Sequence, residues 1–318
     1  MKHPQGPAVQ PSSAPTDPPR DTPAAWFEAG LRLMQAGQLA QAEHCGRSAL
    51  ALDQGHAESL HLMGMLCIAS RQYDLAIEWF AMAIRQNPDV ADYFSNLGMA
   101  LQRKERIDEA IRCYDRSLTL NPKQPELFFR MGELLRQQKR IDEAMLSFDQ
   151  AFNLKADYWE AANAAGLLYF EARRFEEAAE RFTRSVEIDP KQGGAYNLIS
   201  RCLWPLRRYE EALESARKAV ELVPDDPEIN KNMALVLQKL ERHEEALAWF
   251  DKTLALRADF PSALNDRFTT LFALSRHEEG FADIDRARHE LGYEPKTSLS
   301  EGLAHYVAWY RSHRGRRE

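Results

Sequence analysis

The chain has 318 residues, of which 44% are hydrophobic and 28% are charged, and its formal net charge is -7. This composition fits a folded soluble protein and excludes a fibrous or largely disordered one. Charges of both signs are interleaved and the balance is acidic, which argues against nucleic acid as a partner. No apolar run approaches the roughly 20 residues that cross a bilayer, and no secretory leader follows Met1. We therefore expect no membrane partner and a cytoplasmic location.

The first segment, residues 1–22, is rich in proline and contains almost no large apolar residue. Serine, threonine and glutamine stand between the prolines. Such a segment cannot bury enough apolar surface to offset the entropy cost of ordering it. The sequence therefore predicts a disordered Pro-rich N-terminal segment at residues 1–22.

From residue 23 onward, small residues recur at an interval of 34 residues. The glycines in this series are Gly30, Gly64, Gly98, Gly132 and Gly166. The alanines are Ala42, Ala76, Ala110, Ala144, Ala178, Ala212 and Ala246. Larger apolar residues keep the same interval, three or four positions from the small ones, which puts them on one face of a helix. Each unit is therefore predicted to hold two amphipathic helices, with the small residues where the helices approach closely.

Prolines mark the ends of the predicted helices. The second helix of a unit is expected to end before a proline, because the residue preceding proline is pushed out of the α region. The prolines in this position are Pro88, Pro122, Pro190 and Pro224. Other prolines stand at helix starts, where a missing N–H is tolerated: Pro125, Pro227 and Pro261. Pro205 falls late in the first helix of the sixth unit and should end or kink that helix early.

The pattern Trp26…Gly30…Ala42, and the fuller version Phe94-Ser-Asn-Leu97-Gly98…Ala110…Tyr114…Pro122, resemble the tetratricopeptide repeat family. The resemblance implies an all-α fold, an α-solenoid wound as a right-handed superhelix, with about eight 34-residue helix-turn-helix repeats. The expected array spans residues 23–294. Its repeats would be 23–56, 57–90, 91–124, 125–158, 159–192, 193–226, 227–260 and 261–294.

Residues 295–318 follow the expected array. Ser298 and Glu301 have the spacing of a capping box that starts a helix. Since an open array leaves its last apolar face uncovered, we expect a C-terminal capping helix and a basic tail here. About the last 30 residues also resemble the closing segment of nucleotide-sugar epimerases of the extended short-chain dehydrogenase family. The catalytic motifs of that family, G-x-x-G-x-x-G and Tyr-x-x-x-Lys, are absent from the sequence.

The sequence offers no constellation that predicts catalysis. The nearest approach to a ligand cluster is the run of His44, Cys45, His56, His61 and Cys67, which falls on different predicted helices without zinc spacing. Paired acids such as Glu176-Glu177 recur in the first turn of second helices, where negative charge suits the helix dipole. We therefore predict no catalytic residue, no metal and no cofactor, and a protein that is not an enzyme.

In the tetratricopeptide repeat family the first helix of each repeat lines a concave groove, so the resemblance implies a groove here too. Aromatic, arginine and amide side chains at such positions are candidates for contacts with a peptide. The candidate partner-binding residues are Phe129, Arg136, Asn163, Phe170, Asn197, Arg201, Trp204 and Lys231. A carboxylate clamp for chaperone C-termini is not expected, because only Asn96 and Arg130 match its pattern.

These observations predict a scaffold or adaptor that binds a peptide or protein surface of unknown identity in its concave groove. The alternative is the repeat arm of a bacterial glycosyltransferase or sugar-modifying system that lacks its catalytic domain. That alternative depends on the run from Arg276 to Asp283, which resembles the approach to such a domain.

Overall fold

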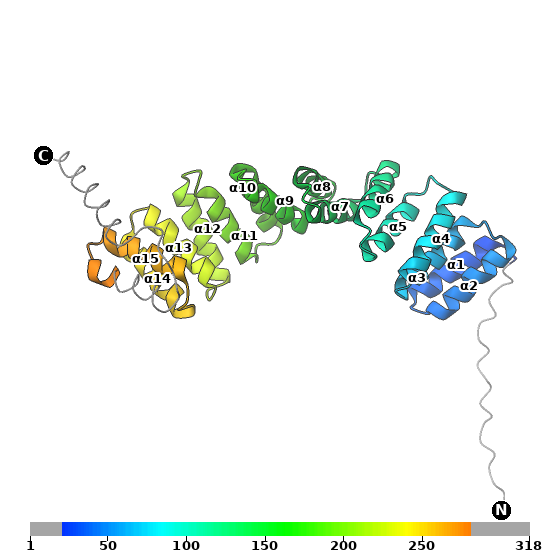
Figure 1. The fold of residues 1–318 in the computed structure, drawn as a ribbon, viewed down its shortest axis with the longest axis horizontal. Coiled ribbons are helices and arrows are strands. Elements are labelled where there is room, and N and C mark those ends of the chain that lie inside the picture. The colour runs from blue at the N-terminus through cyan, green and yellow to red at the C-terminus, as the bar shows by residue number, and fades with distance from the viewer. Residues whose placement is uncertain (1–20, 281–318) are drawn as a thin grey trace, which may run out of the picture. The chain divides into compact units, whose positions relative to one another are not determined.

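The computed structural model describes residues 21–280, which are helical apart from short connections (Figure 1). The helices are α1 Pro23–Gln35, α2 Leu39–Leu52, α3 Ala57–Ala69, α4 Tyr73–Gln86, α5 Ala91–Arg103, α6 Ile107–Leu120, α7 Pro125–Gln137, α8 Ile141–Leu154, α9 Trp159–Glu171, α10 Phe175–Ile188, α11 Gly193–Leu203, α12 Tyr209–Leu222, α13 Pro227–Lys239, α14 His243–Leu256 and α15 Pro261–Ala273. Residues 277–280 form one more helical turn, and no strand occurs within 21–280. The predicted all-α class is confirmed.

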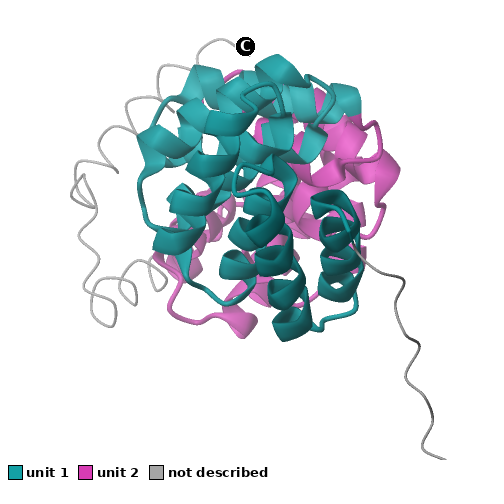
Figure 2. Ribbon diagram, turned by 90° about the vertical axis from the view of Figure 1, so that its right-hand side faces the viewer, with its two compact units in different colours: residues 1–154 teal, residues 155–318 magenta. Residues whose placement is uncertain are grey.

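Each odd-numbered helix from α1 to α13 packs against the even-numbered helix that follows it, and each of these pairs falls within one predicted 34-residue repeat. The chain divides into two compact units, unit 1 at residues 1–154 and unit 2 at residues 155–318 (Figure 2). Among the described residues, unit 1 holds α1 to α8 and unit 2 holds α9 to α15. The predicted disordered segment and the predicted capping helix with its basic tail lie outside the described residues, apart from Asp21 and Thr22.

The helix ends follow the prolines, as predicted. Helices α4, α6, α10 and α12 are capped by the residue before a proline, and α7, α13 and α15 begin with proline. The predicted early end in the sixth repeat is also confirmed: α11 stops at Leu203 and has 11 residues, whereas the equivalent helices have 13. The reason is that Pro205 has no N–H to donate to the preceding turn.

The repeated glycines make room for aromatic rings. A Cβ atom on Gly98 would lie 2.5 Å from Cε1 of Tyr114, whose side chain is fully buried between α5 and α6. At Gly132 and Gly166 the same atom would lie 2.8 Å from a ring carbon of a buried phenylalanine on the next helix. The seven alanines of the repeat are all 0% exposed. The sequence predicted a close approach of the two helices at these glycines. The atoms nearest to each glycine are ring carbons of the second helix rather than its backbone.

Two repeats fill this space differently. In the first repeat, the position that holds an aromatic ring in the next four repeats is held by Gly46. Leu62 and Met63 from α3 fill the volume beside Gly30 and Gly46 instead. In the sixth repeat both positions are small, since Ser200 and Ala216 are each 0% exposed. The Ser200 hydroxyl accepts a hydrogen bond from Asn232 Nδ2 at 3.0 Å. The core of unit 2 is therefore more polar at this repeat.

Every helix pair turns through one residue in the left-handed region. These residues are Gly37, Arg71, Glu105, Lys139, Arg173, Arg207, Glu241 and Ser275, with φ between 58° and 75°. The next residue donates its N–H to a carbonyl five residues back, as Arg106 does to Leu101 at 3.0 Å. This bond closes the end of the first helix and fixes the reversal into the second. Only the first of these positions is glycine, so the others carry backbone strain.

Replacing Glu105 by glycine is therefore expected to raise the free energy of unfolding by up to about 1 kcal/mol, because glycine has no Cβ to clash in this conformation. Replacing Gly37 by alanine should lower it by about 1 kcal/mol, since a Cβ there meets nothing within 4 Å and only the backbone is affected. Urea denaturation followed by circular dichroism measures both. A loss of stability in the glycine variant would show that the strain assigned to Glu105 is absent.

An arginine at the start of most second helices binds the glutamate three residues later. The pairs are Arg106–Glu109, Arg140–Glu143, Arg174–Glu177, Arg208–Glu211, Arg242–Glu245 and Arg276–Glu279, with shortest distances of 2.6 to 2.8 Å. The bonded guanidinium lowers the pKa of carboxyls such as Glu109 and Glu211. The paired acids of the second helices, such as Glu176 and Glu177 on α10, stand in the first helical turn, as expected. Their contribution to stability is small, because these pairs are solvent-exposed.

Candidate functional site

A hollow of about 700 Å³ opens on unit 2. It is lined by Phe170, Glu171, Arg173, Phe175, Asn197, Arg201, Trp204, Pro205, Glu228, Lys231, Asn232 and Leu235. Most of these residues belong to α9, α11 and α13, the first helices of three successive repeats. Because the interval is 34 residues, Asn197 and Lys231 hold the same position in neighbouring repeats, as do Phe170 and Trp204. The hollow is thus built from equivalent faces of adjacent helices.

Cations lie over aromatic rings in and beside this hollow. The Arg201 guanidinium is 5.0 Å from the centre of the Phe170 ring, and Lys239 Nζ is 5.5 Å from the Trp204 ring. Lys231 Nζ lies 4.7 Å from the Phe260 ring and donates to Ser262 Oγ at 2.9 Å. Such contacts hold flexible cationic side chains in place. The wall of the hollow therefore presents fixed positive charge next to apolar ring surface.

Two polar atoms in the wall have no hydrogen-bond partner among the described residues. They are Asn197 Oδ1, an acceptor, and Trp204 Nε1, a donor. Asn232, by contrast, donates its amide to Ser200 Oγ. A buried polar atom without a partner costs about 1–3 kcal/mol, so such atoms are rare in folded proteins. Both atoms are buried, and each leaves one hydrogen bond unmade within the described residues.

Arg201 differs from the arginines at the helix starts because it is bonded to no carboxylate among the described residues. Its side chain is exposed. Glu228, at the edge of the hollow, lies 3.4 Å from Arg257 and 3.9 Å from Lys231, so its charge is already balanced. Arg201 and Arg173 are therefore the two guanidinium groups in this wall that make no ion pair within the described residues, and Arg201 is the one held over an aromatic ring.

Five of the residues predicted from the sequence come together in this hollow: Phe170, Asn197, Arg201, Trp204 and Lys231. The other three lie apart from it. Asn163 on α9 donates its amide to Gln192 Oε1 at 2.8 Å, and its own Oδ1 is buried without a partner. On α7 in unit 1, Phe129 packs against Phe148 with ring centres 5.3 Å apart. Arg136 is held by Glu133 of the same helix at 2.9 Å.

The sequence interpretation missed the other seven lining residues: Glu171, Arg173, Phe175, Pro205, Glu228, Asn232 and Leu235. Leu235 stands 34 residues after Arg201, so the repeat interval applied once more would have found it. Asn232 is buried and bonded to Ser200, a contact between repeats that no spacing within one repeat indicates.

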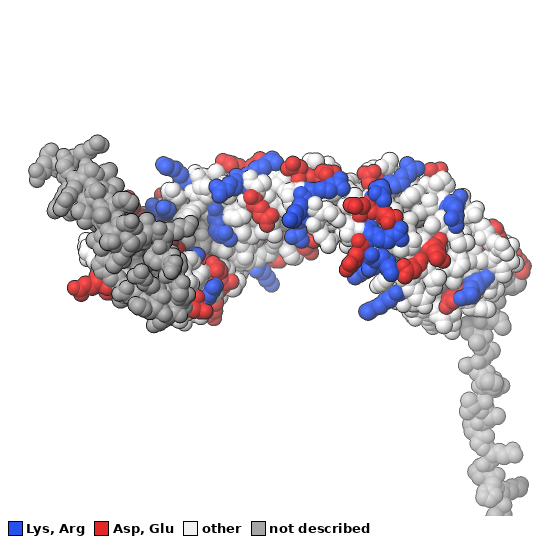
Figure 3. Space-filling model, in the orientation of Figure 1, with Lys and Arg blue, Asp and Glu red and all other residues white. Residues whose placement is uncertain are grey.

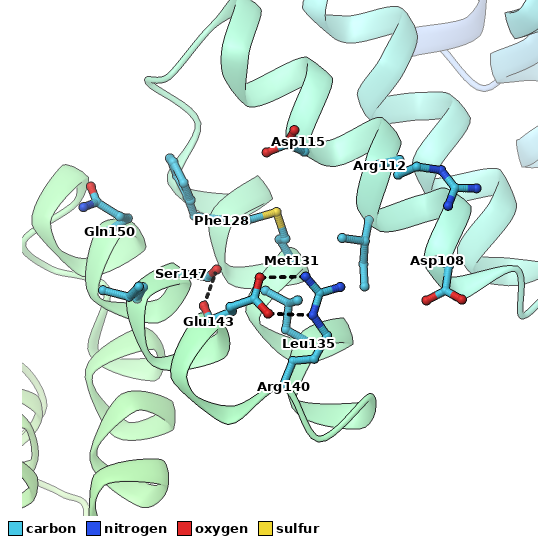
Figure 4. A pocket seen from close by; sticks show the side chains of 12 residues that line it. Asp108, Arg112, Asp115, Phe128, Met131, Leu135, Arg140, Glu143, Ser147 and Gln150 are labelled. Atoms are coloured by element: carbon cyan, nitrogen blue, oxygen red, sulfur yellow. Dashed lines mark hydrogen bonds and ion pairs between the residues drawn. The ribbon is translucent and has the colours of Figure 1, made fainter.

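A second hollow, of about 810 Å³, lies on unit 1 between α6, α7 and α8 (Figure 4). Ile111, Phe128, Met131, Leu135 and Leu146 supply its apolar side chains. Three of its polar residues bond one another: Arg140 binds Glu143 at 2.6 Å, and Ser147 Oγ donates to the Glu143 carbonyl at 2.8 Å. None of the predicted partner-binding residues lines it. Because it brings together none of those residues, this hollow is the weaker candidate.

Unit 1 also contains a buried histidine on α3. The His61 ring lies 4.7 Å from the Tyr93 ring and 5.4 Å from the Phe80 ring, centre to centre, and is 9% exposed. Asn96 Nδ2 donates to His61 Nε2 at 2.7 Å, which requires a neutral ring with its proton on Nδ1. Burial lowers the pKa of His61 to about 4, although the nearby Asp92 charge opposes this shift. The side chain is therefore uncharged at neutral pH.

Charges of both signs are intermixed over the visible face of each unit (Figure 3). Among residues 21–280, no three histidine, cysteine, aspartate or glutamate side chains are arranged to hold a metal ion. No helix in this described part of the chain is long and apolar enough to cross a membrane.

Several solved structures resemble the chain in fold. The C-terminal part of a TPR repeat-containing protein from Cytophaga hutchinsonii is 16% identical, with a TM-score of 0.60 over 76% of this chain and 98% of that one. YrrB, described as a TPR protein with an unusual peptide-binding site, is 22% identical, with a TM-score of 0.53 over 58% and 96%. PilF of Pseudomonas aeruginosa is 20% identical, with a TM-score of 0.52 over 67% and 96%. At these identities the likeness establishes the fold alone.

No curated protein sequence matches the chain. A family model described as "Cilia and flagella-associated protein 70 C-terminal domain" matches residues 2–235, and one described as "Tetratricopeptide repeat" matches residues 232–258. Neither match reaches the epimerase-like segment near the C-terminus, which also lies outside the described residues. The chain therefore belongs to the tetratricopeptide repeat proteins, in the family described as Cilia and flagella-associated protein 70 C-terminal domain.

Proposed function

We propose that this protein is a non-enzymatic scaffold that binds an extended peptide segment of a partner protein in the hollow of unit 2. The observation that carries the proposal is the pair of unbonded polar atoms, Asn197 Oδ1 and Trp204 Nε1, in a wall that also holds an unpaired Arg201. A main-chain amide supplies one N–H and one C=O, the complements of these two atoms. An extended peptide has such amides at every residue.

The aromatic residues favour the same function. Phe170 and Trp204 are half-buried and border the hollow, so each offers apolar surface to a ligand. Tryptophan, tyrosine and arginine are enriched among the few residues that carry most of the binding energy in protein interfaces. Phe129, Arg136 and Asn163 remain candidate partner contacts at positions outside this hollow.

The alternative function, a repeat arm of a glycosyltransferase or sugar-modifying system, gains no support from the similar proteins. A direct assay tests the non-enzymatic assignment. Incubation of the purified full chain with sugar nucleotides is expected to give no turnover, and measurable turnover would contradict the non-enzymatic assignment.

Binding in the hollow is tested by selecting peptides from a random display library on the immobilised full chain and measuring their affinities by calorimetry. Replacing Asn197 and Trp204 together by alanine should weaken the selected peptides at least about tenfold, since a truncated hot-spot residue costs 2 kcal/mol or more. The double variant must first show an unchanged circular dichroism spectrum.

A matched control replaces Asn153 and Trp249 by alanine. These residues lie on α8 and α14, outside the hollow. The control should bind the selected peptides as the wild type does. Selected peptides that bind the Asn197 and Trp204 variant with full affinity would contradict the proposed site.

A further inference from the structure

We propose that the hollow of unit 2 selects an acidic segment, with an aspartate or glutamate carboxylate of the ligand bound by Arg201 while the adjacent main-chain amide lies between Asn197 and Trp204. This inference rests on the proposed function and adds the chemical class of the ligand. The occupant is an extended stretch of a partner protein that carries at least one acidic side chain next to the bound amide.

The charge of the wall supports an acidic ligand. Arg201 and Lys231 stand on neighbouring first helices and both line the hollow. Arg173 also lines the hollow, so three cations stand against two acids, Glu171 and Glu228. Glu228 is engaged by Arg257 and Lys231, and no ion pair joins Glu171 to Arg201. Because Arg201 has no carboxylate partner within the described residues, it meets a ligand carboxylate without first breaking an internal pair. A guanidinium binds a carboxylate through two parallel N–H···O bonds, which also fixes the ligand's orientation.

The ring beneath Arg201 supports the same ligand. Phe170 lies 5.0 Å from the guanidinium carbon and holds it by a cation–π contact. Such a contact uses the flat face of the guanidinium and leaves its N–H groups at the edges to donate elsewhere. Arg201 is therefore positioned in advance, and less side-chain entropy is lost when the carboxylate binds.

The amide pair sets where the ligand backbone lies. Asn197 and Arg201 are four residues apart on α11, so their side chains point to the same side of the helix. Trp204, the C-cap residue of α11, follows three residues later and has helical backbone angles, so it continues the same face. One helix face thus presents an acceptor, a cation and a donor in order, which matches a peptide that runs along it with a side-chain carboxylate beside a main-chain amide.

The chain's own N-terminal segment is a poor occupant, because residues 1–20 contain one acid, Asp17, against Lys2 and Arg20. A synthetic peptide of residues 1–20 is included in the test for this reason. If it bound the hollow more tightly than the acidic peptides described next, the proposal would be overturned.

The test uses the peptides selected from the random library on the full chain. Peptides that depend on Asn197 and Trp204 are expected to be enriched in aspartate and glutamate. Each is then synthesised twice, once as selected and once with its acids changed to glutamine or asparagine. The wild-type chain should bind the acidic form about tenfold more tightly, as expected for one charge-assisted bidentate pair.

The Arg201→Gln variant should bind the acidic form about tenfold more weakly and should no longer distinguish it from the neutral form. The matched control is Arg217→Gln, which removes the same charge from an exposed position on α12 of the same repeat and should keep the wild-type preference. Thermal unfolding checks that both variants fold.

The failures are distinguishable. If peptides bind through Asn197 and Trp204 but show no acidic enrichment, or if both forms bind the wild type equally, the acidic preference is wrong and the peptide site stands. If no peptide depends on Asn197 and Trp204, the proposed function fails and the preference fails with it. Equal weakening of the acidic and neutral forms by Arg201→Gln would also overturn the proposal, because Arg201 would then act on shape rather than on charge.

Discussion

Replacing Gly98 by alanine is expected to lower the free energy of unfolding by about 1–2 kcal/mol, although alanine is the better helix former by roughly 1 kcal/mol. The added Cβ would lie 2.5 Å from the Tyr114 ring and 3.2 Å from the Ala110 carbonyl oxygen. Tyr114 cannot move away, since its ring is fully buried and its hydroxyl donates to Gln102 Oε1 at 2.9 Å. Urea denaturation of the full chain, followed by circular dichroism, measures the loss.

Two variants test this explanation. In Gly194→Ala the new Cβ meets nothing within 4 Å on α11, so stability should rise by up to about 1 kcal/mol. Tyr114→Ala alone should cost about 3–5 kcal/mol through the cavity it leaves. In that background Gly98→Ala should no longer destabilise, because the ring that it would strike is gone. An equal loss with and without the ring would show that Gly98 is small for another reason.

Lowering the pH from 6.5 to 4 is expected to remove up to about 3 kcal/mol of stability through His61 alone, at 1.36 kcal/mol for each unit of pKa difference. The pKa of His61 is lowered from 6.5 to about 4 in the folded chain because the ring is buried. Below pH 6.5 the unfolded chain binds a proton that the folded chain does not, so unfolding is favoured as the pH falls. Below the folded pKa the loss levels off.

The control is His61→Gln, which retains an acceptor for Asn96 but does not titrate in this range. Surface carboxylates such as Glu109 and Glu245, whose pKa values are lowered by bonded arginines, also lose stabilising contacts in acid. They do so equally in both proteins, so the difference between wild type and variant isolates the histidine. Parallel stability curves for the two between pH 6.5 and 4 would contradict the assignment of a buried neutral His61.

The candidate site shows how far helical spacing reaches. Asn197, Arg201 and Trp204 could be placed on one helix face because residues three or four positions apart on a helix lie on the same side of it. Spacing could also place Glu133 within reach of Arg136, three residues later on the same helix, but it could not show whether a carboxylate from a neighbouring helix reaches Arg201. That outcome depends on which carboxylates the neighbouring helices bring within reach.

The sequence by itself determined the helix pairs, their ends and the places where they approach closely, because a 34-residue interval, proline and small side chains act through local geometry. The tertiary structure decided what fills each close approach. A ring covers Gly98, whereas Leu62 reaches across from the next repeat to cover Gly30. It also decided that Glu105, and not a glycine, takes the left-handed turn, and that the Asn197 and Trp204 polar atoms stay unbonded. These outcomes depend on packing between residues that are distant in sequence, and no periodicity within one repeat contains that information.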